Sequence, residues 1–294
     1  MKRIIIFTAT LLLAVMLSAK PTDIVSEARK SNMQFEKIDV SRCVSVIVEQ
    51  RKEGNIILRA EARVMPYVEL EVTNNTLHAS ISSSFKISKT APKVEILIPD
   101  NGKIKNIECR ESAKIIFQPV LTSDLIQIEC SGASTVELNC ESKTIEIECR
   151  GASILSGKIT TEKCTMACSG ASCIKGTLNC TELMCECGGA SKLKLEGTAQ
   201  NAELSCAGAS KADFEKIQCK TIKAKVSGAS ASSITGENCT VVCSGASNMR
   251  IDCSTLLNID VSGGASVTYR GDCLIGKLNN NFGSIKHKQA IRKQ

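Results

Sequence analysis

The sequence predicts an all-β protein: a right-handed parallel β-helix, or solenoid, of ~19-residue coils with an irregular N-terminal β cap. Three observations support this fold. The triplet Gly-Ala-Ser occurs eight times at near-constant spacing, apolar and polar residues alternate on both sides of the triplets, and aromatic residues make up only 3% of the chain. A fixed period of this length is typical of a solenoid, in which each repeat buries its apolar face against its neighbours.

The triplet occurs once in each repeat and marks where one coil ends and the next begins. The steps from one triplet glycine to the next are 19, 19, 19, 19, 20, 17 and 19 residues. Glycine suits a corner because it takes a positive φ without a Cβ clash, and Ala and Ser are small enough for successive corners to stack. We therefore expect a structural corner ladder of glycines, with the serines that follow them forming a ladder of hydrogen bonds. The eight glycines are Gly132, Gly151, Gly170, Gly189, Gly208, Gly228, Gly245 and Gly264.

Alternating runs flank each triplet. Before the first triplet the apolar positions are Ile126, Ile128 and Cys130, and after it they continue with Val136 and Leu138. Strict period-two alternation predicts a strand with one buried face. Each coil is therefore predicted to hold at least two strands, with the triplet at the corner between them. The usual handedness of parallel crossovers favours a right-handed winding.

Residues 1–19 are predicted to be a secretory signal peptide. Lys2 and Arg3 supply the charged start, Ile4–Leu17 the apolar stretch, and Ser18–Ala19 the small-residue end. An uncleaved membrane anchor is the alternative, although the apolar run falls short of the ~20 residues that a spanning helix needs. No other run is long and apolar enough, so we expect no transmembrane segment in the mature chain.

The rest of the chain divides by its pattern. Residues 20–34 are expected to be a polar lead-in, either helical or disordered. Residues 35–105 alternate without the triplet and are predicted to form an N-terminal β cap or irregular coils that protect the end of the solenoid from edge-to-edge pairing. Residues 106–276 are predicted to be the repeat β-helix, and residues 277–294 a basic C-terminal tail.

Charge disfavours one class of partner. The chain has 37 basic and 30 acidic residues, but the excess lies in the predicted signal peptide and tail, and the segment between them is neutral. A protein that binds nucleic acid is expected to carry a basic stripe on its folded face. The composition therefore predicts no nucleic-acid partner.

Seventeen cysteines in an exported chain would ordinarily indicate a disulfide framework. Here six of them occupy one column of the repeat, two residues before the triplet, and Val226 and Val261 take the same place in other coils. A position that accepts valine is typical of a buried free thiol, so we predict a stacked ladder of buried thiols, with occasional bridges between neighbouring coils as an open alternative. The six thiols are Cys130, Cys149, Cys168, Cys187, Cys206 and Cys243.

Metal and catalytic sites find little support in the sequence. The pairs Cys164/Cys168, Cys185/Cys187 and Cys239/Cys243 share a strand face, but that face is the predicted interior and no histidine joins them. The two histidines, His78 and His287, have no evident nucleophile arrangement. We therefore expect no metal, no cofactor and no enzyme activity.

The N-terminal part and the repeats together resemble a known family. The segment Phe-Glu-Lys-Ile-Asp-Val-Ser at 35–41, the segment Pro-Tyr-Val-Glu-Leu-Glu-Val-Thr-Asn-Asn-Thr-Leu at 66–77, the strand at 94–99 and the Ser-Gly-Ala-Ser repeats look like the head GIN domain family of auto-transporter adhesins from Bacteroidetes. The resemblance covers about residues 35–275 and implies a right-handed β-helix in an extracytoplasmic setting. It departs from the family at Arg42-Cys43, where glycine is usual, and in its richness in cysteine.

The leading hypothesis is a non-enzymatic exported binding or structural module, an adhesin of the cell envelope in the periplasm or on the cell surface. A glycan or an envelope protein is the expected partner. The alternative is a carbohydrate-active enzyme of the lyase or hydrolase type on acidic glycans, which would need converging Asp, Glu, Arg or Lys in an outer groove. A third hypothesis is thiol-based metal or redox buffering.

Overall fold

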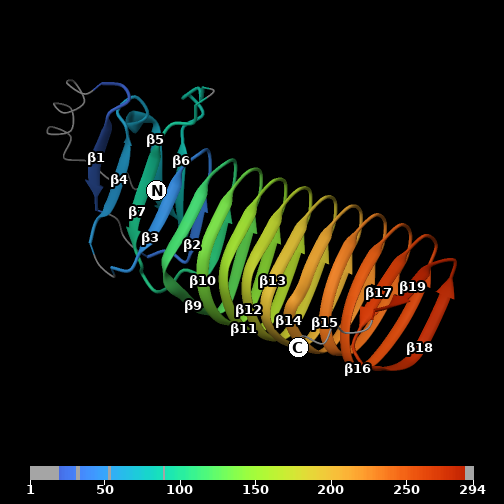
Figure 1. Ribbon diagram of the computed structural model, residues 1–294. Coiled ribbons are helices and arrows are strands. Elements are labelled where there is room, and N and C mark those ends of the chain that lie inside the picture. Colours follow the sequence, from blue (N-terminus) through green and yellow to red (C-terminus); the bar gives the residue numbers. More distant parts are fainter. Residues whose placement is uncertain (1–19, 31–33, 52–53, 89, 289–294) are drawn as a thin grey trace, which may run out of the picture.

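The fold is a parallel β-solenoid, as predicted. The structure is a computed structural model that describes residues 20–30, 34–51, 54–88 and 90–288. Within these ranges nineteen strands belong to one hydrogen-bonded sheet, and the single helical element is a 3-10 turn, η1 (Met65–Tyr67). The sheet winds into a rod that runs from β1 at one end to β18 and β19 at the other (Figure 1). The predicted signal peptide lies outside the described residues.

Each coil of the repeat is one long strand rather than the two strands that the sequence predicted. Both alternating runs belong to it, because the ladder of hydrogen bonds continues around the bend that joins them. We call the half that follows a corner face B and the half that precedes the next corner face A. The strands are β9 (Lys114–Cys130), β10 (Thr135–Cys149), β11 (Ile154–Cys168), β12 (Cys173–Cys187), β13 (Lys192–Cys206), β14 (Lys211–Val226), β15 (Ala231–Cys243) and β16 (Asn248–Ser262).

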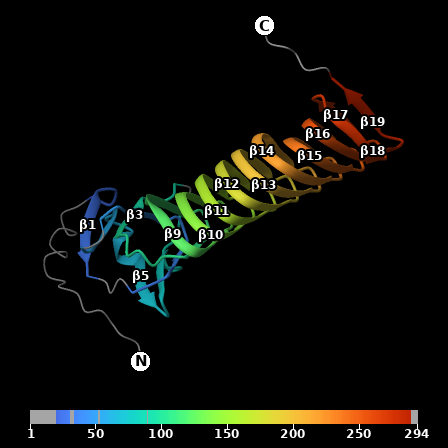
Figure 2. The same cartoon turned by 90° about the horizontal axis from the view of Figure 1, so that it is seen from below.

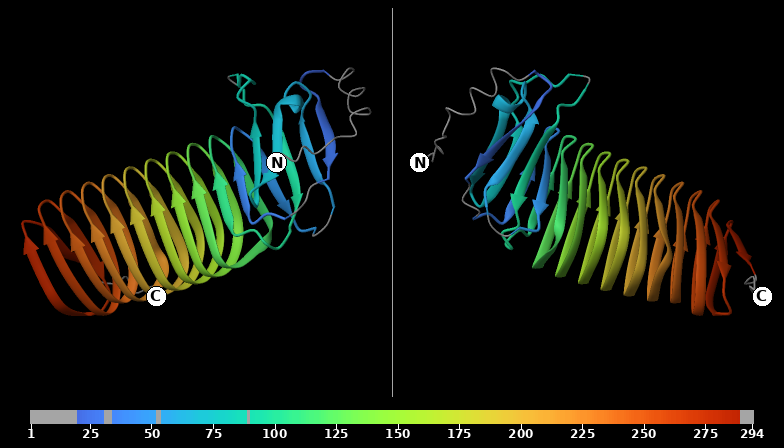
Figure 3. Two further views of the ribbon diagram at one scale, coloured as in Figure 1. Left: turned by 180° about the vertical axis from the view of Figure 1, so that it is seen from behind. Right: turned by 60° about the vertical axis from the view of Figure 1, so that its left-hand side comes forward.

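Neighbouring coils keep one register along the rod. Val136 pairs with Leu155 on face B and Cys149 pairs with Cys168 on face A, both a full repeat apart. Inward side chains therefore stack in columns, and the core is one continuous apolar cluster from the cap to the last coils. Figures 2 and 3 show the coils stacked in a single line.

The corners stack backbone on backbone. The eight corner glycines that have a positive φ lie between 64° and 73°. The N–H of Ala171 donates to the carbonyl of Gly151 at 2.7 Å, and a Cβ on Gly170 would lie only 2.7 Å from that same oxygen. In the last corner it is Gly263, and not the predicted Gly264, that has the positive φ and stacks on Gly245.

The corner serines form a second, buried ladder. The hydroxyl of Ser172 donates to the carbonyl of Cys149 at 3.0 Å, and that of Ser210 to the carbonyl of Cys187 at 3.2 Å. Each serine thus reaches back to the preceding coil, and both are at most 1% exposed. Six corner serines make such a bond to the preceding coil, whereas the buried hydroxyl of Ser134, in the first triplet, has no hydrogen-bond partner among the described residues. The six are Ser153, Ser172, Ser191, Ser210, Ser230 and Ser247.

The N-terminal cap does not stack in chain order. β2 (Lys37–Val40) and β3 (Ser45–Glu49) form a first coil next to β8 (Asn106–Cys109) and the start of β9. On their other side lie β6 (Thr76–Ile81) and β7 (Val94–Pro99), which are parallel to them.

Antiparallel strands close the N-terminal end. β5 (Val68–Thr73) lies outside β6, and β4 (Ile56–Glu61) lies outside β7. The outermost strand on face B is β1 (Ile24–Arg29), which pairs with β4. The lead-in that was expected to be helical or disordered therefore contains a strand, because β4 offers it a free edge.

The solenoid also continues beyond its predicted end. β17 (Ser266–Arg270) pairs with β16, β18 (Leu274–Asn281) adds to face A of β16, and β19 (Ser284–His287) adds to β17 on face B. Half of the expected basic tail, residues 277–281 and 284–287, is thus part of the sheet, and its last six residues lie outside the described ranges. The described residues contain no helix that is long and apolar enough to cross a bilayer.

The corner ladder predicts a position-specific cost of adding one methyl group. Gly170→Ala forces a positive φ on an L-residue and drives a Cβ against the backbone of Gly151, so we expect a loss of about 3 kcal/mol or more in the free energy of unfolding. Urea denaturation measures this loss.

Gly102→Ala is the matched control. Gly102 also has a positive φ, of 65°, but no atom lies within 4 Å of its Cβ position. Its loss should stay near 1 kcal/mol, the conformational cost alone. Equal losses in the two variants would mean that stacking of the corners adds nothing.

Candidate functional site

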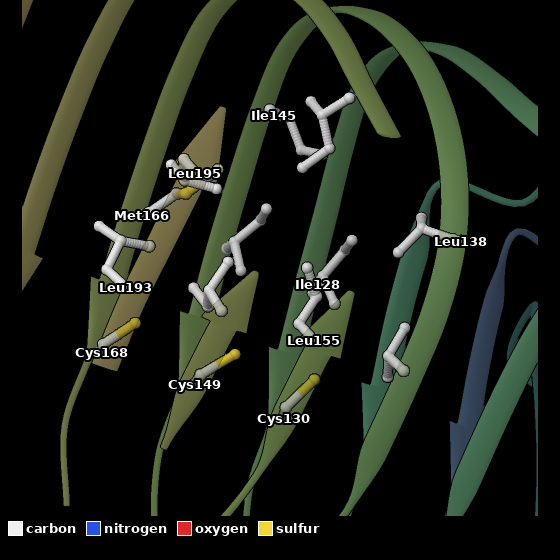
Figure 4. Close-up of a cluster of buried hydrophobic side chains, with 14 of the residues drawn as sticks. Ile128, Cys130, Leu138, Ile145, Cys149, Leu155, Met166, Cys168, Leu193 and Leu195 are labelled. Carbon is white, nitrogen blue, oxygen red and sulfur yellow. The ribbon is translucent and has the colours of Figure 1, made fainter. Parts of the chain in front are cut away.

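The predicted thiol column lies inside the rod. Cys130, Cys149 and Cys168 lie in line on successive coils (Figure 4), and each is at most 3% exposed. The column continues through Cys187 and Cys206 and also includes Cys109, which the sequence analysis did not assign to it. All seventeen cysteines are free thiols in this structure.

Burial suppresses the acidity of several of these thiols. Removal from water raises the pKa of Cys109, Cys140 and Cys243 to about 12. The neighbouring thiol of Cys149, together with burial, raises the pKa of Cys130 as well. The thiolate is the form that attacks electrophiles and binds metals, so at neutral pH these side chains act as small apolar groups.

The other candidate residues show no catalytic or metal-binding geometry among the described residues. No three His, Cys, Asp or Glu side chains there are arranged to hold a metal. His78 lies 3.2 Å from a carboxylate oxygen of Asp39, and the ring of His287 stacks on Tyr269 at 4.6 Å. Neither contact places a serine or cysteine nucleophile beside a histidine.

Face B has a hollow that the sequence analysis missed. In the inward column that begins at Leu138, the next two coils have Gly157 and Gly176. A Cβ on Gly176 would lie 2.0 Å from the carbonyl oxygen of Gly157, so only glycine allows the strands this approach. A groove of about 650 Å³ lies over these glycines, and its walls include Lys175, Lys194 and other residues of β12–β14.

Exposed lysines gather around this groove. Lys175 pairs in register with Lys194, and Lys192 with Lys211, so like charges stand on neighbouring parallel strands that lie about 4.8 Å apart. We call the following six residues the lysine cluster. They are Lys158, Lys175, Lys192, Lys194, Lys211 and Lys216.

Three carboxylates offset part of this charge, because Glu196, Asp213 and Glu215 also line the groove and Asp213 is the register partner of Lys194. Glu196 lies 3.9 Å from the ammonium group of Lys216, and Asp213 accepts hydrogen bonds from Ser233 and from the backbone of Glu215. Among the described residues, no carboxylate lies within ion-pair distance of the other five lysines. The segment between the predicted signal peptide and tail is neutral overall, but face B carries a local positive surface. A comparison of outward-facing residues that lie one period apart in the sequence could have predicted it.

Face A is different in character. Glu129 and Glu148 are register partners on adjacent coils, and Glu148 forms an ion pair with Arg150. Gln127 donates to Glu146 at 2.8 Å beside them. The acidic residues near the cap and the lysine cluster in the middle of the rod thus lie on opposite faces.

Comparison with known proteins agrees with this architecture. A family model described as "Putative auto-transporter adhesin, head GIN domain" matches residues 34–172 and 154–236. The chain belongs to this family. The resemblance noted in the sequence is confirmed, and no curated protein matches this head GIN domain protein.

Two solved structures from Parabacteroides distasonis are similar in fold. One is described as a putative lipid binding protein, with 17% identity, a TM-score of 0.55, and coverage of 90% of this chain and 97% of that one. The other is described as a putative adhesin, with 13% identity, a TM-score of 0.55, and coverage of 92% and 98%. At these identities the likeness shows the fold alone.

The structure explains one departure of this head GIN domain protein from its family. Arg42, where the resemblance led us to expect glycine, has a φ of 55°, which costs an L-residue about 1–2 kcal/mol. Its guanidinium donates to the carbonyl of Ile81 at 2.6 Å and to those of Ser82 and Phe85 at 3.5 Å. These hydrogen bonds hold the segment that follows β6 against the first corner. They also offset the backbone strain of the positive φ at Arg42.

The thiol column predicts a loss of stability in alkali. Thiols of the unfolded chain ionise near pH 9, whereas the buried thiols of Cys109 and Cys243 resist ionisation up to about pH 12. Their contribution is fully present below pH 9 and is lost as the pH rises toward 12, by about 1.4 kcal/mol per pH unit for each such thiol. Urea unfolding under reducing conditions, from about pH 8 to about pH 10, measures this slope.

The variant Cys109→Val/Cys243→Val separates the thiols from other groups that titrate in alkali. Valine already occupies this column at Val226, so the variant should fold. Its slope should be shallower by about 1.4 kcal/mol per pH unit for each thiol replaced. An unchanged slope would show that these two thiols do not contribute.

Proposed function

We propose that the protein is a non-enzymatic binding module of the cell envelope that holds an acidic glycan on face B. The proposal rests on the lysine cluster around the groove that lies over Gly157 and Gly176. Membership of an adhesin family supports an exported or surface setting. The glycan class follows from the charge of the cluster and the open length of the face.

The cluster is costly without a ligand. Like charges directly opposite each other on neighbouring strands are destabilising, and Lys175/Lys194 and Lys192/Lys211 are two such pairs side by side. Asp213 lies opposite Lys194 on the next strand and offsets only part of this repulsion. A bound carboxylate or sulfate group would relieve this repulsion. Ligand binding would therefore recover energy that the free protein loses.

The sheet holds the cluster in a fixed arrangement. Each lysine lies on a strand that is hydrogen-bonded on both sides, so the spacing of about 4.8 Å between neighbouring strands is constant across the cluster. The backbone of this array loses little conformational freedom when it binds a polymer with regularly spaced anionic groups, so the main entropic cost is the ordering of the lysine side chains, about 0.5–1.5 kcal/mol each. An extended acidic polysaccharide matches this requirement better than a small anion, because it contacts several coils at once.

We expect Lys175→Gln/Lys194→Gln to weaken binding of polygalacturonate by at least tenfold, about 1.4 kcal/mol. Binding of the unsubstituted protein should also weaken as the salt concentration rises, since the lysines are exposed. Biolayer interferometry with immobilised polysaccharide, with neutral dextran as the reference polymer, measures both effects.

Lys225→Gln is the matched control, because Lys225 is an exposed lysine on face A. It should leave the affinity unchanged. Absence of binding to any acidic polysaccharide, or an equal loss in the control, would contradict the proposal. Binding of single-stranded RNA with the same dependence on Lys175 and Lys194 would replace the glycan by nucleic acid as the ligand.

The assay also tests the enzymatic alternative. Glu196, Asp213 and Glu215 line the same groove as the lysines. A binding module leaves the polysaccharide intact. Release of new chain ends that is abolished by Glu196→Gln or Asp213→Asn would show a lyase or hydrolase instead.

A further inference from the structure

The two ends of the rod are built differently. At the C-terminal end the outermost strands are β18 on face A and β19 on face B, and no described strand pairs with their outer edges (Figure 1). An unprotected edge of this kind is a template for pairing with another chain. The N-terminal end is also formed by edge strands, β1 and β5, but the side chains that they present differ from those of the C-terminal end.

The C-terminal end exposes core positions. Ile275 and Leu278 continue the inward columns of Leu257 and Ile259, which are at most 1% exposed. Ile275 and Leu278 themselves are 40% and 49% exposed, because no further coil covers them. Nearby, Leu274 is 75% exposed and Phe282, at the turn between β18 and β19, is 91% exposed.

The N-terminal end presents charge at the equivalent place on face B. Glu27 and Arg29 of β1 lie in register with Leu58 and Ile56, whose side chains are at most 1% exposed and inward. The two charged side chains form an ion pair at 3.2 Å and are largely buried. Inward charges on an edge strand block further pairing, so this end resists extension whereas the C-terminal end does not.

We propose that the C-terminal ends of two copies of this chain pair with each other in a two-fold symmetric dimer. A two-fold axis perpendicular to the faces reverses the strand direction, so β18 would lie antiparallel to β18 of the second copy and β19 antiparallel to its equivalent. The inward column of Ile259 and Leu278 would then meet its own equivalent across the junction. The contact is closed, which limits the assembly to two copies.

The area is sufficient for such a contact. β18 has eight residues, so its edge is about 27 Å long, and the two faces of the rod are about 10 Å apart before side chains are added. Side chains on both outer surfaces widen the end to about 20 Å, which gives a footprint of about 500 Å² per copy. The total of about 1,000 Å² reaches the lower limit for a specific interface, which fits a dissociation constant on the order of micromolar.

A register centred on Leu278 avoids a clash of charges. Leu278 then faces Leu278 of the second copy, and Lys277 lies opposite Asn279 instead of another lysine. Leu274 comes near Phe282 of the second copy. Because Lys277, Lys286 and Lys288 still make both ends positive, added salt should strengthen this dimer.

Salt separates this arrangement from a head-to-tail one. The outer strand of the N-terminal end on face A, β5, exposes Glu69 and Glu71 and would attract the positive C-terminal end. A head-to-tail series would therefore weaken with salt and grow beyond two copies. The inward ion pair of β1 argues against it, since that pair would have to meet the apolar edge of β19.

Sedimentation velocity on the full secreted chain over a concentration series, under reducing conditions, tests the proposal. We expect a monomer–dimer equilibrium that ends at the dimer and tightens as salt is added. Leu278→Lys and Phe282→Asp should each raise the dissociation constant at least tenfold. Both residues are exposed at the end of the rod, so the fold should be retained, and thermal unfolding checks this.

Met184→Lys is the matched control, because Met184 is a 45% exposed apolar residue in the middle of face A. It should leave the dimer intact. A monomer at all concentrations would overturn the proposal and indicate that the end is covered in some other way. An open series of oligomers that is weakened by salt would replace the two-fold contact with a head-to-tail one, and an equal effect of Met184→Lys would show that the contact lies elsewhere.

Discussion

The whole molecule depends on the close approach of one glycine backbone to the next at the corners. With a Cβ position only 2.7 Å from the carbonyl oxygen below it, Gly170 can stack on Gly151 only because it has no side chain. This contact holds each coil in register with the one before it. Since a slip of one residue would turn every inward side chain outward, the corner indirectly keeps the core apolar and the thiol column buried. The serine hydroxyls reinforce the same register from inside the corner.

A register that is kept over many coils turns sequence spacing into surface pattern. Residues one period apart become neighbours at about 4.8 Å, whether they are cysteines in the core or lysines on face B. In the interior this regularity stacks apolar side chains in columns. On the outside it places lysines of neighbouring coils next to each other. Gly157 and Gly176 interrupt the regular inward column, and the groove lies at this interruption. The proposed binding surface is thus a local variation on the repeat rather than an inserted loop.

The ends of the rod follow different rules from the middle. A solenoid strand is satisfied on both edges, whereas the terminal strands each leave one edge open. At the N-terminal end, antiparallel strands and the inward Glu27–Arg29 ion pair interrupt the pattern. At the C-terminal end the columns stop at Ile275 and Leu278 with nothing described above them. This asymmetry makes the C-terminal end the place where contact with another chain has the most apolar surface to bury.

The sequence by itself determined the solenoid, its period, the corner triplet and the burial of Cys130 and its neighbours, because all of these follow from local alternation and a fixed repeat. The lysine cluster was also present in the sequence, since Lys175 and Lys194 are one period apart. The net charge of the segment between the predicted signal peptide and tail is zero, however, so net charge alone did not reveal the cluster. Only the tertiary structure decided that β6 and β7 stack outside β2 and β3, that residues 24–29 form an edge strand, and that β18 and β19 extend the rod. It also decided that Gly263 takes the last corner. These features depend on pairing between segments with no shared period, and such pairing is set by which edges remain free once the regular coils have formed.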